Sequence, residues 1–160
     1  MVICPQVLHA GASDCMFFAA AFTASIPAGA AAVACMKLYV SLGAKKENFW
    51  VYDSKGLVHE SRNDLDELKK EFQAKGKNMS LAEALKDADF VYVKNWSSYQ
   101  DYGKVLCTDA NWMLTNAKLA VSNHAKVMHC LPVRRNVELS DEILDGPNSL
   151  VTKQASNRVW

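Results

Sequence analysis

The stretch 127–136 holds the densest set of side chains that could recognise a ligand. An apolar run ends there in His129-Cys130-Leu131-Pro132, and two arginines and an asparagine follow within four residues. Adjacent guanidinium groups offer planar, paired recognition of a carboxylate or a phosphate. Ligands of open α/β sheets bind beyond the carboxyl ends of the strands. The pattern therefore predicts a strand that ends at an anion-binding site.

The elements that must position this site alternate along the chain. Compact apolar runs predict strands, and amphipathic or capped segments predict helices. The expected strands are 48–53, 90–93, 125–130 and 149–151, and the expected helices are 30–42, 64–74, 81–85, 109–116 and 141–144. Residues 16–26 fit either a buried strand or the start of a helix. This alternation predicts an α/β, Rossmann-like, doubly wound and mainly parallel sheet with helices on both faces.

Single residues define the ends of several expected helices. Gly43 is placed as the stop of the first helix, Asn63 as the cap of the second, and Ser80 with Glu83 as a capping box. In the back half, Thr108 and Ser140 stand before expected helices as caps, and Gly146-Pro147 closes the last helix.

Composition limits the class of protein. The chain has 160 residues, half of them apolar, and a net charge of +1, which fits one globular domain over 1–160 and no nucleic-acid partner. Five scattered cysteines without a CxxC pair predict neither a disulfide framework nor a metal site, and favour the cytoplasm. Residues 15–36 lack any charge, but small residues and Pro27 favour a buried strand and helix over a membrane span.

The run 129–136 resembles the His-Cys-Leu-Pro signature of the ornithine-type carbamoyltransferases. The residues that follow, Val-Arg-Arg-Asn, resemble the sequence found at this place in the branch that acts on N-acetyl- or N-succinylornithine. The similarity continues to Arg158 and back to Ala88, so it covers about 87–160. The resemblance implies carbamoyl transfer from carbamoyl phosphate to an N-acylornithine in arginine biosynthesis, without a cofactor and with a homo-oligomer as a further expectation.

The resemblance also implies roles for single residues. Cys130 would lie where the two substrates meet, Arg158 would polarise the carbonyl group that reacts, and Lys94 would bind the amino-acid carboxylate. The alternatives are a buried strand thiol for Cys130, a surface arginine for Arg158 and a solvated strand-end lysine for Lys94. Cys130 is expected as a substrate contact and not as a covalent nucleophile.

Four residues next to Cys130 complete the expected substrate-binding set. The family has a cis bond at the position of Leu131-Pro132, and the backbone there helps to hold the carbamoyl and amino groups. His129 could equally be a satisfied strand-end histidine, and Arg135 could instead form a surface ion pair. Glu138, which stands where some acetylornithine members have a lysine, favours the succinylornithine type.

The front half resembles a different family. Residues 28–44 and 46–56 are similar to the dinucleotide-binding segment of bacterial malic enzymes. Gly29 would lie in the phosphate-binding turn, and Asp53 at a strand end could accept hydrogen bonds from a ribose. Pro27 replaces the first glycine of that motif, which the tight turn needs. The alternatives are that Gly29 only permits close packing and that Asp53 only forms a turn.

The chain therefore combines a malic-enzyme-like half, 28–75, with a carbamoyltransferase-like half, 87–160, and leaves 1–27 unassigned. It lacks the family's Ser-x-Arg-Thr phosphate loop and His-Pro-x-Gln element. An ornithine-binding half alone is expected to bind ligand but not to catalyse. The alternatives are an inactive Rossmann-like chimera and an NAD-binding module.

Overall fold

A computed structural model describes residues 2–4, 22–23, 29–53, 55–93, 110–111, 113–122, 124–129 and 131–156. Strands from both halves of the described chain form one sheet in the order β2-β3-β1-β5-β6, and β4 also pairs with β3, antiparallel and outside this order. The strands are β1 Val2–Cys4, β2 Phe22–Thr23, β3 Trp50–Asp53, β4 Gly56–Leu57, β5 Phe90–Val93 and β6 Lys126–His129.

Strand directions decide where a site can form. β5 and β6 are parallel, whereas β1 is antiparallel to both of its neighbours, β3 and β5. Because β3 and β5 both run opposite to β1, and β6 is parallel to β5, the strands β3, β5 and β6 all run in the same direction. Their last residues, Asp53, Val93 and His129, therefore lie at one edge of the sheet.

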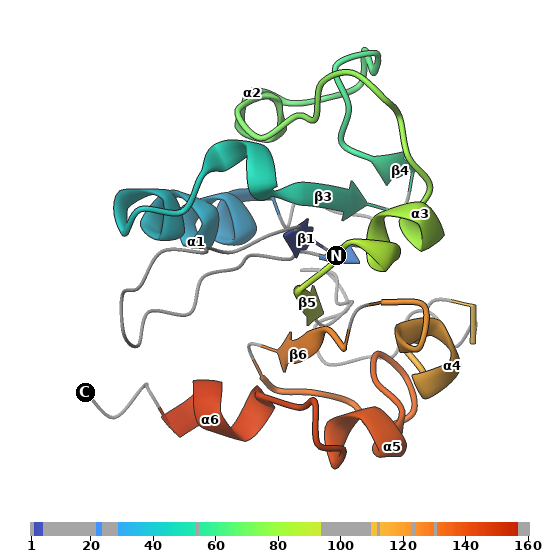
Figure 1. The fold of residues 1–160 in the computed structure, drawn as a ribbon. Coiled ribbons are helices and arrows are strands. Elements are labelled where there is room, and N and C mark those ends of the chain that lie inside the picture. The colour runs from blue at the N-terminus through green and yellow to red at the C-terminus, as the bar shows by residue number, and fades with distance from the viewer. Residues whose placement is uncertain are drawn as a thin grey trace, which may run out of the picture.

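Short helices flank the strands. Figure 1 shows α1 and α6 on one side of the sheet and α3 and α4 on the other. The helices are α1 Gly29–Ser41, α2 Glu67–Lys70, α3 Leu81–Lys86, α4 Asn116–Leu119, α5 Asp141–Leu144 and α6 Val151–Ser156, with a 3₁₀ turn, η1, at Lys46–Asn48. The predicted α/β class is confirmed, and the sheet contains antiparallel pairs beside its parallel ones.

Local sequence signals account for the best-predicted elements. Gly43, two residues after the end of α1, has φ +103°, a conformation that glycine adopts without steric cost. The Ser80 hydroxyl accepts from the Glu83 N–H at 3.3 Å, and the Ser80 N–H donates to the Glu83 carboxylate at 2.9 Å. The predicted capping box is thus confirmed. The strand predicted at 90–93 coincides with β5.

The helix predicted over 64–74 is wrong in length and in its cap. Only α2 is helical, and Asp66, not Asn63, caps it by accepting from the Lys69 N–H at 2.7 Å. After α2 the chain turns and pairs with the residue that follows β4: the Ala74 N–H donates to the Val58 carbonyl at 2.8 Å. This backbone pairing replaces the helical bonds that would have continued α2.

Two predictions in the back half are also wrong. In the segment 109–116, Leu114 is extended and pairs with Leu139, and the helix begins only after Thr115. In the segment 149–151, a single bridge joins Ser149 to Val127, and Val151 already starts α6. Ser140 stands at the cap position of α5 as predicted, but its side chain makes no capping bond.

The core runs through both halves. Val91 and Val127 are fully buried at neighbouring positions of β5 and β6. The Tyr52 hydroxyl of β3 donates to the carbonyls of Met79 and Ser80, at 3.0 and 3.2 Å, and so ties the front half to the start of α3. None of the described helices has the length and apolar character needed to cross a bilayer.

Candidate functional site

The carboxyl end of β6 places His129 in a fully buried position. Its Nδ1 accepts a hydrogen bond from the Leu131 N–H at 2.9 Å. Burial lowers the pKa of His129 to about 4, so the ring is neutral near pH 7. Because Nδ1 is an acceptor, the ring proton lies on Nε2, which has no hydrogen-bond partner among the described residues. His129 is therefore a buried, neutral hydrogen-bond donor.

The backbone at Leu131 and Pro132 has an unusual shape. The Leu131-Pro132 bond is cis, as the resemblance implied. Leu131 itself has φ +51°, in the left-handed region that bulky residues rarely adopt. Such conformations persist where the surroundings hold them, and they cluster at binding sites. Here the bond from the Leu131 N–H to His129 is part of what holds the turn.

Glu138 organises the segment that follows the turn. Its carboxylate is fully buried and accepts the backbone N–H of Arg134 at 2.5 Å, while the Arg134 guanidinium lies 3.8 Å from the second oxygen. The Glu138 carbonyl accepts from the Leu114 N–H at 2.9 Å. Sequence reasoning missed this structural role. The only available signal was the spacing of an arginine and a glutamate four residues apart.

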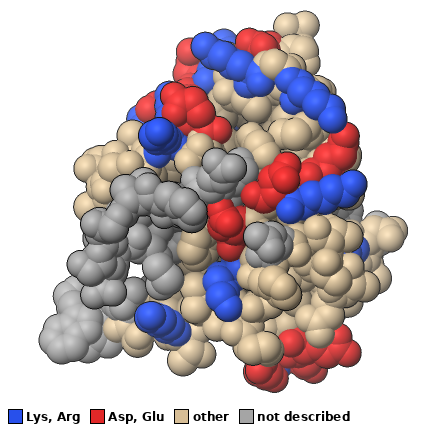
Figure 2. All heavy atoms as spheres, viewed as in Figure 1, with Lys and Arg blue, Asp and Glu red and all other residues tan. Residues whose placement is uncertain are grey.

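Arg135 reaches away from the turn toward α5. Its guanidinium bonds the carboxylates of Asp145, at 2.7 and 2.8 Å, and Asp141, at 2.8 Å, and these bonds raise its pKa. Figure 2 shows a cluster of acidic groups at the end of the molecule where α5 lies. Arg135 thus forms the surface ion pair that was its alternative, although with Asp145 as well as Asp141. Its role as a substrate ligand stays a prediction.

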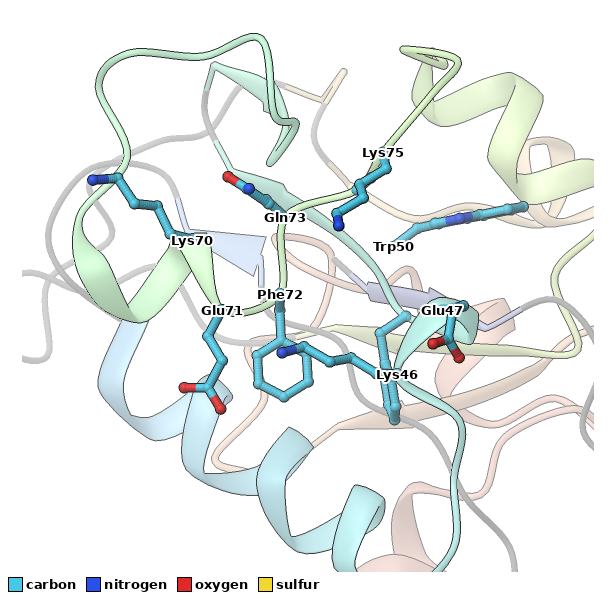
Figure 3. A pocket seen from close by; sticks show the side chains of 10 residues that line it. Lys46, Glu47, Trp50, Lys70, Glu71, Phe72, Gln73 and Lys75 are labelled. Carbon is cyan, nitrogen blue, oxygen red and sulfur yellow. The ribbon is translucent and has the colours of Figure 1, made fainter.

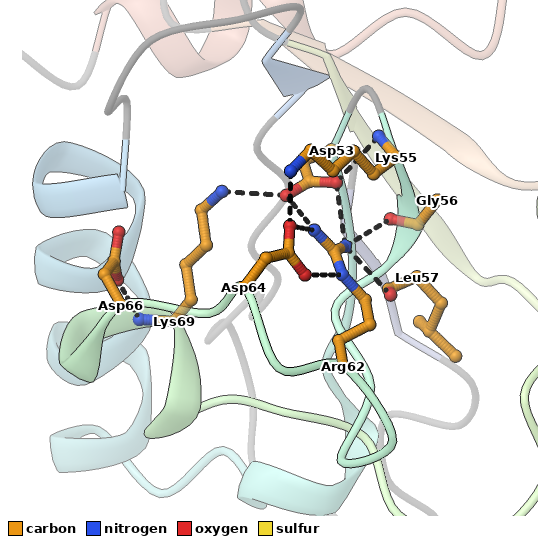
Figure 4. Close-up of polar contacts among 8 residues, drawn as sticks. All are labelled: Asp53, Lys55, Gly56, Leu57, Arg62, Asp64, Asp66 and Lys69. Carbon is orange, nitrogen blue, oxygen red and sulfur yellow. Dashed lines mark hydrogen bonds and ion pairs between the residues drawn. The ribbon is translucent and has the colours of Figure 1, made fainter.

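Asp53 ends β3 at the same sheet edge and has many partners (Figure 4). Arg62 bonds both carboxylate oxygens at 2.9 and 3.1 Å, Lys69 bonds one at 2.7 Å, and the Lys55 N–H donates at 2.9 Å. Burial acts to raise the pKa of Asp53, but the bonds from Arg62, Lys69 and Lys55 outweigh it and hold the pKa below its usual range. Asp64 closes the network by accepting two bonds from Arg62.

The remaining candidates are placed only in part. Gly29 is the first residue of α1, so the predicted phosphate-binding position does lie at a helix start. Cys130, Lys94 and Arg158 lie outside the described residues. No group of three or more potential metal ligands occurs within the described part of the chain.

Comparison with known proteins identifies the family. The sequence model for "Aspartate/ornithine carbamoyltransferase, Asp/Orn binding domain" matches residues 30–160. The chain belongs to this carbamoyltransferase family. The matched residues include most of the segment that resembles malic enzymes as well as the back half.

Relatives within the family match only part of this chain. N-succinylornithine carbamoyltransferase of Bacteroides fragilis is 47% identical over 77 residues, which cover 47% of this chain and 24% of that protein. The ornithine carbamoyltransferase of Pyrococcus furiosus has the same fold, with a TM-score of 0.57 at 19% identity over 88% of this chain and 45% of its own. The chain thus spans about a quarter of the length of the curated carbamoyltransferase it matches.

A protein of another family matches a shorter stretch. The NADP-dependent malic enzyme of Halomonas elongata is 47% identical over 62 residues, which cover 39% of this chain and 15% of that enzyme. The described structure and this similarity leave the cofactor roles of Gly29 and Asp53 as predictions.

Proposed function

We propose that this chain binds an N-acylated ornithine, with N-succinylornithine preferred, as the amino-acid half of a cytoplasmic carbamoyltransferase in arginine biosynthesis. The observation that carries the proposal is the bond between His129 and Leu131, in which the fully buried histidine accepts from the N–H of a left-handed residue. This bond lies at the carboxyl end of β6, where ligands of α/β sheets bind.

In the proposed reaction the side-chain amine of the acylornithine attacks the carbonyl carbon of carbamoyl phosphate. A C–N bond forms, the bond from carbon to the phosphate oxygen breaks, and the amine loses a proton. Catalysis of this kind depends on orientation and on stabilisation of charge at the carbonyl oxygen. Cys130 and the backbone at Leu131 would hold the carbamoyl and amino groups, and Arg158 would polarise the carbonyl.

Two further groups are assigned to the amino-acid substrate. Lys94 would bind its carboxylate directly after β5, next to β6 in the sheet. Arg135 would have to exchange its bonds to Asp141 and Asp145 for substrate contacts. Carbamoyl phosphate requires a phosphate loop that this chain does not contain, so we propose binding without turnover by the chain alone. A homo-oligomer is proposed as its assembly.

Isothermal titration calorimetry tests the binding. The chain is titrated with N-succinyl-L-ornithine, N-acetyl-L-ornithine and L-ornithine in turn. We expect the succinyl compound to bind most tightly, and Lys94→Ala and Arg135→Ala each to weaken it about fivefold or more. Lys86→Ala, an exposed lysine on α3, serves as the matched control. Equal affinity for all three compounds, or no effect of both variants, would overturn the assignment.

We also infer that the front half shares ancestry with malic enzymes, so that the chain joins segments of two Rossmann-type origins. The 47% identity over 62 residues to an NADP-dependent malic enzyme supports this second proposal. A retained cofactor function would use Gly29 and Asp53. Titration with NADH, followed by its fluorescence, tests that function: enhancement that Asp53→Asn abolishes would support it, and no enhancement would reject it.

A further inference from the structure

A pocket lies between the start of β3 and the loop after α2, at the opposite edge of the sheet from His129. Trp50 is the first residue of β3. It lies opposite Ile3 of β1, which in turn lies opposite Val91 of β5, whereas His129 is the last residue of β6. The cavity has a volume of about 510 Å³, within the range of pockets that hold small molecules. Its lining is Lys46, Glu47, Phe49, Trp50, Lys70, Glu71, Phe72, Gln73, Ala74 and Lys75.

Aromatic rings form the apolar part of this pocket. Phe49 and Phe72 are buried and meet edge to face, with ring centroids 6.0 Å apart. The half-buried Trp50 adds an indole that remains partly open to solvent. A flat ring can stack on such an indole, and stacking on aromatic side chains tolerates any planar base.

Ammonium groups form the charged part. The Lys46 Nζ lies 4.9 Å from the centre of the Phe72 ring, and Figure 3 shows the Lys75 side chain entering from the loop above it while Lys70 points away. Lys70 is paired with Glu67, and Glu71 is paired with Lys37. No ion pair of Lys46, Lys75 or Glu47 occurs among the described residues, so the lining retains two ammonium groups against one carboxylate.

We propose that this pocket binds a nucleoside monophosphate. The ring would stack on Trp50, and the phosphate would be neutralised by Lys46 and Lys75. Glu47 and the Gln73 amide would accept bonds from ring amines or sugar hydroxyls, groups that a bare anion does not carry. The pocket is separate from the edge of the sheet that holds the proposed acylornithine site, so the two ligands bind without competing.

Calorimetric titration with AMP, adenosine and inorganic phosphate tests the proposal, and a parallel NMR titration follows the Trp50 indole N–H. We expect AMP to bind and to shift the Trp50 signal, with adenosine and phosphate each weaker by about tenfold or more. The exposed Lys75 permits Lys75→Ala and Lys75→Glu without loss of packing, and these should weaken AMP binding about fivefold and more than fivefold. Lys86→Ala is the control.

Several outcomes would overturn the proposal: phosphate binding as tightly as AMP, adenosine binding as tightly as AMP, AMP binding that Lys75→Glu leaves unchanged, or no AMP binding at millimolar concentrations. The same Lys75 variants are titrated with N-succinyl-L-ornithine. Unchanged affinity for that compound separates failure of this pocket from failure of the acylornithine site.

Discussion

The buried carboxylate of Glu138 accepts the backbone N–H of Arg134, four residues earlier, at 2.5 Å. This bond draws the chain after the cis proline back toward the core. We expect Glu138→Gln, which keeps the shape but removes the charge, to lower the free energy of unfolding by about 2 kcal/mol. Urea denaturation measures the loss. Glu67→Gln, at an exposed ion pair on α2, should change it by less than about 0.5 kcal/mol. Equal effects of the two substitutions would contradict a structural role for Glu138.

Stability should depend on pH through His129. Burial lowers its folded-state pKa from 6.5 to about 4, so between these values the unfolded chain binds a proton that the folded chain does not. The stability is therefore fully present above pH 6.5 and is lost as the pH falls toward 4, by roughly 3 kcal/mol. His129→Asn retains a side-chain acceptor for Leu131 but cannot titrate.

Urea midpoints of the wild type and of His129→Asn, measured at pH 7.5 and 4.5, check this expectation. The variant should lose much less stability over that interval. His124→Asn, at an exposed residue with φ +54°, is the control because asparagine tolerates the same backbone conformation. A pH dependence that His129→Asn leaves intact would assign the effect to other groups.

The Asp53 network should stabilise the front half at neutral pH. Arg62 and Lys69 are both largely buried around this carboxylate, so Asp53→Asn leaves them without their shared partner. We expect a loss of about 3 kcal/mol. Asp64→Asn, at a more exposed carboxylate that also bonds Arg62, should cost much less.

The free energy of unfolding of the wild type and of Asp53→Asn should also respond differently to acid. Because the folded-state pKa of Asp53 lies below its usual value, the stability it contributes is present above about pH 3.9 and is lost as the pH falls through the folded-state pKa. The difference in unfolding free energy between the wild type and Asp53→Asn should therefore shrink below pH 3.9. A constant difference down to pH 2 would show that charge at Asp53 does not matter.

We expect the two halves to unfold together. β1 pairs with a strand of each half, and Tyr52 bonds the chain just before α3. A urea titration followed by far-UV circular dichroism and tryptophan fluorescence should give coincident, cooperative transitions. Trp50 reports on the front half, and Trp50→Phe leaves only reporters of the back half. Separate midpoints for the two proteins would show two independently folding units.

Local signals predicted the elements that local interactions stabilise. The capping box at Ser80, the glycine stop after α1 and the buried strand β5 all coincide with the structure. The errors arose where partners distant in sequence decide the conformation. Ala74 pairs with Val58 rather than continuing α2, and Leu114 pairs with Leu139 rather than forming a helix. β1 could not be foreseen, because a run of three residues has no measurable period.

In the candidate site, too, some features could be predicted from the sequence and others could not. The strand end at His129 and the cis bond at Leu131 followed from the motif and its family. The buried position of Glu138 did not, because its partner is a backbone N–H whose direction depends on the turn before it. The ion pairs of Arg135 were foreseen only as an alternative, since a sequence cannot say which of several nearby carboxylates a flexible guanidinium reaches.

The bonds around Asp53 have a consequence for any sugar that approaches this strand end. Both carboxylate oxygens are already held, one by Arg62 and the Lys55 N–H and the other by Arg62 and Lys69. In this state Arg62 and Lys69 compete with an incoming sugar diol for the Asp53 carboxylate. Because both side chains belong to the same chain, their local concentration is high, and the diol must displace them. The observed affinity would be reduced by the fraction of molecules in which the network is open.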